Sequence, residues 1–164
     1  MNAKSSFGNW NFIAFLIITF YTMGAGFVES LVNYPLWHIV GPSEVWTAYH
    51  IALGPKIIAV LAIPALLLQL ITNVLLLFFR PVILPKWTAW ITLIILLVAL
   101  VSTAIIQLPI QATLDSGYTR ELVDYLIDTD LYLRIWMTVL RAVIIVYMLL
   151  LVVRRGTQTT YAIA

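Results

Sequence analysis

The stretch LYLRIWMTVLRAVIIVYMLLLVV, residues 131–153, decides the fold of this chain. A transmembrane helix needs about 20 mostly apolar residues, and this stretch is long enough to cross a bilayer as one helix. Arg134 and Arg141 lie inside it. An arginine near the bilayer centre costs roughly 2.5–3.5 kcal/mol on insertion scales, so such a residue is expected to face a bundle interior and to have a partner there. The stretch therefore predicts both a membrane span and a polar site.

The composition extends this prediction to the whole chain. Of the 164 residues, 63% are hydrophobic and 10% are charged, and the mean hydropathy is +1.03. These values are typical of an integral membrane protein. The apolar runs predict four spans, at about residues 10–32, 57–79, 87–108 and 131–153. We expect an all-α integral membrane protein, a four-transmembrane-helix bundle that forms a single domain over residues 1–164.

The basic residues predict the orientation. Cytoplasmic loops of membrane proteins are enriched in lysine and arginine. With four spans, the N-terminus, the second connection and the C-terminus share one side, and the basic residues near them are Lys4, Arg80, Lys86, Arg154 and Arg155. The loops of the other side have only Arg120. Both termini are therefore predicted to be cytoplasmic, in a bacterial inner membrane. The formal charge of +2 gives no reason to expect nucleic acid, and the absence of cysteine excludes disulfides and thiolate metal sites.

Polar residues converge near the predicted outer boundary of the membrane. A rise of 1.5 Å per residue places Glu29, Lys56 and Arg134 near that boundary and Arg141 about 10 Å deeper. One hypothesis is a cavity that opens toward the outer leaflet and binds the polar head of a hydrophobic molecule. Its expected catalytic residues are His50, Glu29 and Arg141. Its expected substrate-binding residues are Arg134, Arg141, Lys56, Gln107, Gln111 and Trp46.

The alternative hypothesis for the same residues is structural. Glu29 and Arg141 would neutralise each other as a buried ion pair. The two glutamines would cap a helix end, and Lys56 would extend to the membrane interface. The sequence leaves both hypotheses open.

The two outer connections are longer than a hairpin requires. Residues 33–49 are rich in aromatic side chains suited to the headgroup region. Residues 119–128 predict an amphipathic helix at the outer face, before the fourth span. Both connections could act as lids or as interfacial anchors. His38 and His50 could bind a metal or haem, but no HExxH or Glu-x-x-His motif accompanies them, so we predict no metal and no cofactor while leaving that binding open.

Two short motifs suggest a family. The first is Leu108-Pro109-Ile110-Gln111, at the end of the third predicted span, and the second runs from Thr129 through Arg134 and Trp136 to Arg141. With them the chain resembles the anthrone-oxygenase-like family of small four-helix bacterial membrane proteins, although Gln111 stands where asparagine is more usual. The resemblance implies, for some members, the oxidation of polycyclic phenolic substrates without a bound metal; most members have no assigned activity.

Two classes of function follow. In the first, the protein is a binder or oxygenase-like enzyme for a hydrophobic oxygenated aromatic molecule of the anthrone or quinone type, in contact with membrane lipid. In the second, it is a non-catalytic accessory subunit or small transporter component. A homo-oligomer or a partner subunit is compatible with either class.

Overall fold

The computed structural model describes the backbone of residues 3–161 and the side chains of residues 6–65 and 67–155. Over that range the chain forms four long helical rods that contain α-helical segments (α) and π-helical turns (η). The first rod comprises α1 (Ala3–Val28), η1 (Glu29–Asn33) and α2 (Tyr34–Val40). The second comprises α3 (Trp46–Ile57), η2 (Ile58–Ala62), η3 (Pro64–Gln69) and α4 (Leu70–Phe78). The third comprises α5 (Lys86–Ser102), η4 (Thr103–Gln107) and α6 (Leu108–Leu114), and the fourth comprises α7 (Arg120–Asp130), η5 (Leu131–Ile135) and α8 (Trp136–Tyr161).

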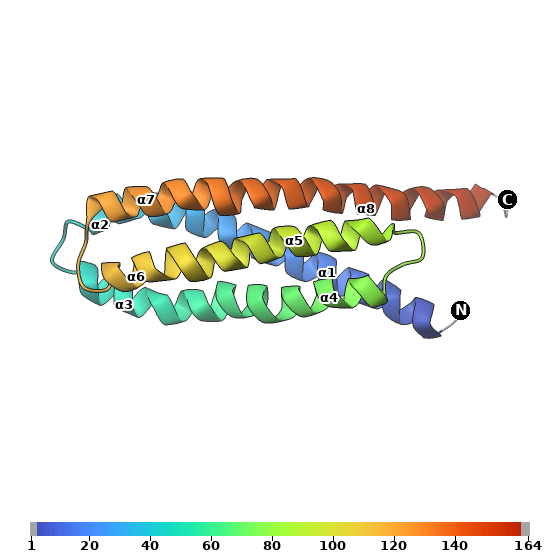
Figure 1. Ribbon diagram of the computed structural model, residues 1–164, viewed down its shortest axis with the longest axis horizontal. Coiled ribbons are helices and arrows are strands. Elements are labelled where there is room, and N and C mark those ends of the chain that lie inside the picture. Colours follow the sequence, from blue (N-terminus) through green and yellow to red (C-terminus); the bar gives the residue numbers. More distant parts are fainter. Residues whose placement is uncertain (1–2, 162–164) are drawn as a thin grey trace.

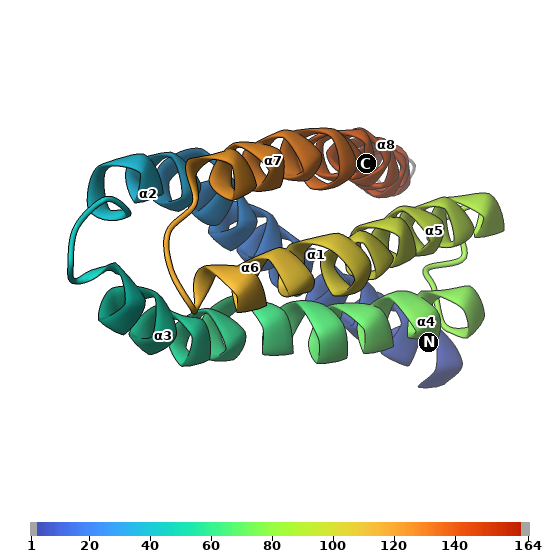
Figure 2. The same ribbon diagram turned by 60° about the vertical axis from the view of Figure 1, so that its left-hand side comes forward.

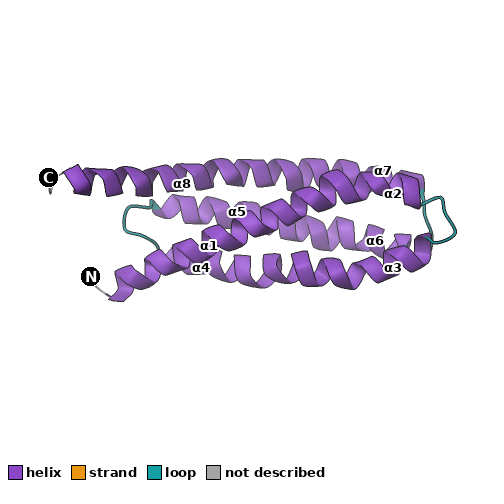
Figure 3. Cartoon of the chain, turned by 180° about the vertical axis from the view of Figure 1, so that it is seen from behind, coloured by secondary structure: helices purple, strands orange, loops and turns teal. Residues whose placement is uncertain are grey.

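The rods lie side by side and alternate in direction (Figure 1). The start of α1 and the end of α8 are at one end of the bundle, and the turns that follow α2 and α6 are at the other (Figure 3). We call this second end the head. Helix α1 packs against α4, α5 packs against both α4 and α8, and α2 packs against α7 at the head (Figure 2). Rods that follow one another in the sequence therefore also pack side by side. Short turns join them, as in other antiparallel four-helix bundles.

The prediction of four long apolar helices is confirmed. The segments long and apolar enough to cross a membrane are Ser6–Val40, Trp46–Phe78, Lys86–Leu114 and Arg120–Arg155. Only 17% to 33% of their most apolar windows is buried inside the protein. Helices that expose apolar side chains on most of their surface fit a lipid environment. The four helices therefore suggest a multi-pass membrane protein.

The rods are longer than the predicted spans, because the expected outer connections are themselves helical. The connection predicted over residues 33–49 shrinks to residues 41–45, because the rod continues through η1 and α2, with Pro35 in the first turn of α2. The amphipathic helix predicted over residues 119–128 is present as α7, but it continues through η5 into α8 along one line (Figure 1). It packs against α2 along its buried face and is not a separate helix lying across the outer face.

Prolines explain most of the π-helical turns. Proline has no N–H, so the carbonyl four residues earlier loses its helical partner and the hydrogen-bond register shifts. Pro35, Pro64 and Pro109 each follow a π-helical turn that contains this carbonyl residue. For Pro64, the freed carbonyl of Val60 accepts a hydrogen bond from the Tyr21 hydroxyl at 2.9 Å. The π-helical turns fall at the level of the bundle where polar residues gather.

Two packed clusters of apolar side chains leave a gap in the middle of the bundle. Near the termini, Phe12, Phe15 and Leu76 centre one cluster. At the head, Trp37 and Trp46 centre the other, together with apolar residues of α6 and α7. The segments between the two clusters include the π-helical turns, and they surround the site described next.

Candidate functional site: a cavity between the four rods

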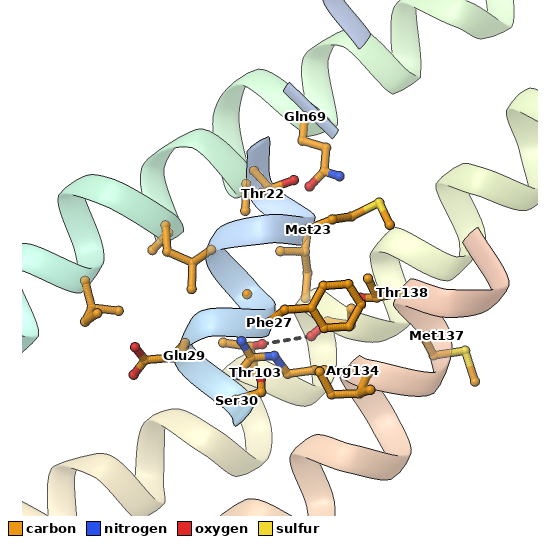
Figure 4. A pocket seen from close by; sticks show the side chains of 18 of the residues that line it. Thr22, Met23, Phe27, Glu29, Ser30, Gln69, Thr103, Arg134, Met137 and Thr138 are labelled. Atoms are coloured by element: carbon orange, nitrogen blue, oxygen red, sulfur yellow. Dashed lines mark hydrogen bonds between the residues drawn. The ribbon is translucent and has the colours of Figure 1, made fainter. Parts of the chain in front are cut away.

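A cavity of about 220 Å³ lies between the two clusters, and all four rods contribute to its walls. Most of the wall is apolar. Its polar residues are Thr22, Glu29, Ser30, Tyr34, Gln69, Thr103, Gln111, Arg134, Thr138 and Arg141. In Figure 4, Gln69 and Thr22 lie on one side of the cavity, and Glu29, Ser30 and Arg134 lie on the other. Arg134 and Arg141 are seven residues apart on one rod, so about 10 Å of helix separates the two cations.

Arg141 lies deep in the bundle and is only 4% exposed. One of its terminal nitrogens, Nη2, donates to Asn73 Oδ1 at 2.9 Å, and its guanidinium lies 5.5 Å from the ring centroid of Phe15. The Asn73 amide in turn donates to the carbonyl of Ala89 and to Thr92 Oγ1, both at 3.2 Å. Asn73 therefore connects three rods. Its amide oxygen accepts a hydrogen bond from one guanidinium N–H, but as a neutral group it does not neutralise the positive charge of Arg141.

The expected ion pair between Glu29 and Arg141 is not present. Glu29 is also buried, at 4% exposure, but its Oε2 accepts a hydrogen bond from Asn33 Nδ2 at 2.6 Å. Among the side chains that the structure describes, no carboxylate lies within ion-pair distance of Arg141, and its Nε has no hydrogen-bond partner. The two residues share a cavity and do not meet, because they belong to opposite ends of it. An estimate of depth along separate helices cannot resolve such a separation.

Arg134 is already paired. Its Nη1 lies 2.8 Å from Asp130 Oδ1, one helical turn earlier on the same rod. The same nitrogen donates to the Tyr34 hydroxyl at 3.4 Å, which also accepts from Gln111 Nε2 at 3.2 Å. Asp130 is 1% exposed, so this ion pair is screened little by water. The head side of the cavity thus has a neutralised arginine, whereas the deeper side has one without a carboxylate.

Four of the predicted site residues line the cavity, and four do not. Glu29, Arg134, Arg141 and Gln111 line it. The residues that the structure places elsewhere are His50, Trp46, Lys56 and Gln107.

Each of these four has a definite position. His50 and Trp46 belong to the head cluster, with ring centroids 4.8 Å apart, and His50 Nδ1 lies 2.7 Å from Asp115 Oδ1. Lys56 is exposed on the second rod. Gln107 is fully buried, and neither its amide nitrogen nor its amide oxygen has a hydrogen-bond partner among the described residues.

Three residues of the cavity network escaped the sequence analysis of the site. Asp130 could have been found, because it precedes Arg134 by four residues and such pairs meet on one helix face. Asn73 is a polar residue within an apolar span, a pattern that by itself indicates only hydrogen bonding between helices. Tyr34 was grouped with the aromatic residues of a loop, and nothing in the sequence indicated that the first helix would extend far enough to bring its hydroxyl to Arg134.

Comparison with protein-family models, with curated proteins and with solved structures finds no match to this chain. The resemblance to the anthrone-oxygenase-like family therefore stays a prediction. Within the described residues, histidine, aspartate and glutamate form no group of three that could hold a metal ion. The expectation that the protein uses no metal and no cofactor also stays a prediction.

Proposed function

We propose that the protein binds a hydrophobic, oxygen-bearing ring compound of the anthrone or quinone type inside the bundle, and that Arg141 donates to its carbonyl or oxyanion. The observation behind this proposal is a buried guanidinium at a cavity wall without a carboxylate partner among the described residues. Buried charges in proteins are normally paired, and breaking such a pair costs about 3–5 kcal/mol. A ligand oxygen would supply the missing partner.

The size and lining of the cavity support a ring compound. An engineered cavity of about 150 Å³ with apolar walls binds benzene, and this cavity measures about 220 Å³. Its walls are mainly aliphatic side chains and methionines, with a few polar groups at its two ends. That combination is typical of small-molecule sites, in which apolar surface provides affinity and a few polar groups fix the orientation.

Glu29 favours an enzymatic role as a second candidate. Its side chain lines the same cavity, at the end opposite Arg141. Transfer of a proton from the ring compound to the Glu29 carboxylate would leave an enolate or phenolate, whose oxygen Arg141 would stabilise. With dioxygen as the oxidant of that anion, the reaction would be oxygenase-like. In this version the base is Glu29, one of the expected catalytic residues, whereas His50, another of them, lies in the head cluster.

The orientation is part of the same proposal. We place both termini on the cytoplasmic side of a bacterial inner membrane, with the head outside. The unequal distribution of lysine and arginine between the two sides supports this placement, and the start of α1 and the end of α8 lie at the same end of the bundle (Figure 1).

A matched pair of fluorescent probes tests the binding proposal. Anthracene-9-carboxylate and 9-anthracenemethanol have the same ring system and differ in charge. We expect wild-type protein in nanodiscs to bind at least one of them, with the carboxylate the tighter ligand. Arg141→Gln should weaken carboxylate binding by about 1.5–3 kcal/mol, the value of a hydrogen bond to a charged group, or roughly tenfold to a hundredfold in Kd.

The control variant is Arg120→Gln, because the Arg120 side chain is 79% exposed and does not line the cavity. It should bind both probes as wild type does. Arg141→Lys retains the charge but loses the planar donor fork, so it should bind the carboxylate less tightly than wild type. If neither probe binds, or if binding is indifferent to Arg141, the second class of function, an accessory subunit or transporter component, replaces this proposal.

A further inference from the structure

We propose that Tyr118 is the terminal electron donor of a chain of aromatic rings that begins at the cavity wall, with His38 as the acceptor of its proton. The proposal concerns the head cluster, and it rests on the proposed function for its oxidant, a one-electron-oxidised form of the cavity ring compound. The photo-oxidant in the test below replaces that compound, so the chain of rings is tested separately from ligand binding.

The rings form an unbroken series. Tyr34 lines the cavity. Its ring centroid lies 4.8 Å from that of Trp37, Trp37 lies 5.6 Å from Trp46, and Trp46 lies 5.5 Å from Tyr118. The first three are at most 2% exposed. Tyrosine and tryptophan are among the side chains most easily oxidised by one electron, so a hole can pass along such contacts in short steps.

The hydrogen bond between the Tyr118 hydroxyl and His38 makes Tyr118 the ring on which the oxidation is localised. An oxidised phenol is a strong acid, so its oxidation is easier when a base can take the proton. The Tyr118 hydroxyl lies 3.0 Å from His38 Nδ1, and His38 Nε2 lies 3.1 Å from Asp124 Oδ1. Because the carboxylate accepts the proton of Nε2, Nδ1 is left as the acceptor for the phenol. Asp124 then stabilises the imidazolium that forms.

The other three rings lack such a base. The Tyr34 oxygen accepts from Arg134 and Gln111, so a cation and an amide donor surround it, and both oppose the loss of an electron there. Trp37 Nε1 is buried without a hydrogen-bond partner among the described residues. Trp46 Nε1 donates to a backbone carbonyl at 2.9 Å, which is a weak base. These rings can pass a hole on but cannot release a proton to a good acceptor.

A glycine permits the position of Tyr118. A Cβ at Gly41 would lie 2.0 Å from Tyr118 Cδ2, far inside van der Waals contact. Only glycine can therefore occupy position 41 while the ring lies against α2 and its hydroxyl reaches His38. The arrangement joins helix α2 to the turn after α6 through this hydrogen bond.

The transfer balances as follows. A one-electron-oxidised ring compound in the cavity, such as a phenoxyl or semiquinone radical, gains one electron and becomes a closed-shell anion. Tyr118 loses that electron through the chain, and its hydroxyl proton moves to His38 Nδ1. The products at the head are a neutral tyrosyl radical and an imidazolium. The side chains of His38 and Asp124 are 28% and 55% exposed, so a water-soluble one-electron reductant can restore the tyrosine there.

The test uses a photo-oxidant at a defined position. The chain has no cysteine, so Leu31→Cys can be labelled uniquely with an anthraquinone maleimide; Leu31 is 57% exposed and lies one helical turn before Tyr34. Flash excitation in nanodiscs should reduce the anthraquinone by one electron and give a tyrosyl radical detectable by electron paramagnetic resonance. Tyr118→Phe and His38→Gln should each lose this signal. Tyr125→Phe is the control, because Tyr125 is an exposed tyrosine of α7, and it should retain the signal.

Trp37→Phe separates electron transfer from packing. Phenylalanine keeps an aromatic ring in the head cluster but is much harder to oxidise, so a folded Trp37→Phe protein should also lose the Tyr118 radical. The proposal is overturned if wild type forms no tyrosyl radical, if the radical persists in Tyr118→Phe, or if it is unchanged in Trp37→Phe. It is also overturned if the wild-type radical resides on Tyr34.

Discussion

The contact between Arg141 and Asn73 should be the strongest polar coupling between rods in the cavity network. We consider Asn73→Leu, which removes the acceptor of the guanidinium and two neutral hydrogen bonds. Neutral hydrogen bonds between membrane helices average about 0.6 kcal/mol, and one to a charged group contributes about 1.5–3 kcal/mol. The free energy of unfolding should therefore fall by about 3–4 kcal/mol.

A double-mutant cycle isolates the charged contact. In an Arg141→Met background the guanidinium is absent, so Asn73→Leu should cost only the neutral hydrogen bonds, about 1 kcal/mol. The coupling energy of the pair should be about 1.5–3 kcal/mol. Reversible unfolding in mixed detergent micelles with increasing dodecyl sulfate measures each free energy of unfolding.

The matched control cycle pairs Arg141→Met with Glu29→Gln. Since these side chains line the same cavity without meeting, their effects should add to within about 0.5 kcal/mol. Additive effects of the Asn73 and Arg141 substitutions would refute the assignment of partners given above. A coupling above about 1 kcal/mol between Glu29 and Arg141 would also refute it, and would restore the ion pair that the sequence suggested.

Three further predictions follow from the cavity and the orientation. Gly26→Leu should abolish probe binding in nanodiscs with little loss of stability, because Gly26 lines the cavity and a Cβ there meets nothing within 4 Å; unchanged binding would place the ligand elsewhere. A cysteine at Ser43 should react with an impermeant thiol reagent applied outside cells, and one at Ser5 should not; the reverse result would invert the proposed orientation. Asp130→Asn should lower the free energy of unfolding by about 3–5 kcal/mol, because it leaves the largely buried Arg134 without its carboxylate; a thermal melt indistinguishable from that of wild type would contradict this.

The sequence alone was sufficient to predict four helices long and apolar enough to cross a membrane. Uninterrupted apolar runs can satisfy their backbone groups in lipid only as helices, so length and hydropathy predict the rods with little ambiguity. The residues that line the cavity were predictable in part for the same reason: Glu29, Arg134, Arg141 and Gln111 are polar groups within apolar helices, where such groups are expected to face the interior.

The partners within the cavity were decided by the tertiary structure. Sequence places a residue on a helix at an approximate depth, but it does not fix the rotation of that helix about its axis, which depends on packing against its neighbours. Rotation and the π-helical turns bring Asn73, and not Glu29, to Arg141. The same packing extends the helices through the expected loops and brings Tyr34, Trp37 and Tyr118 into one series of rings. Hydropathy therefore determines which residues are inside, whereas the close packing of side chains from distant parts of the chain determines which of them meet.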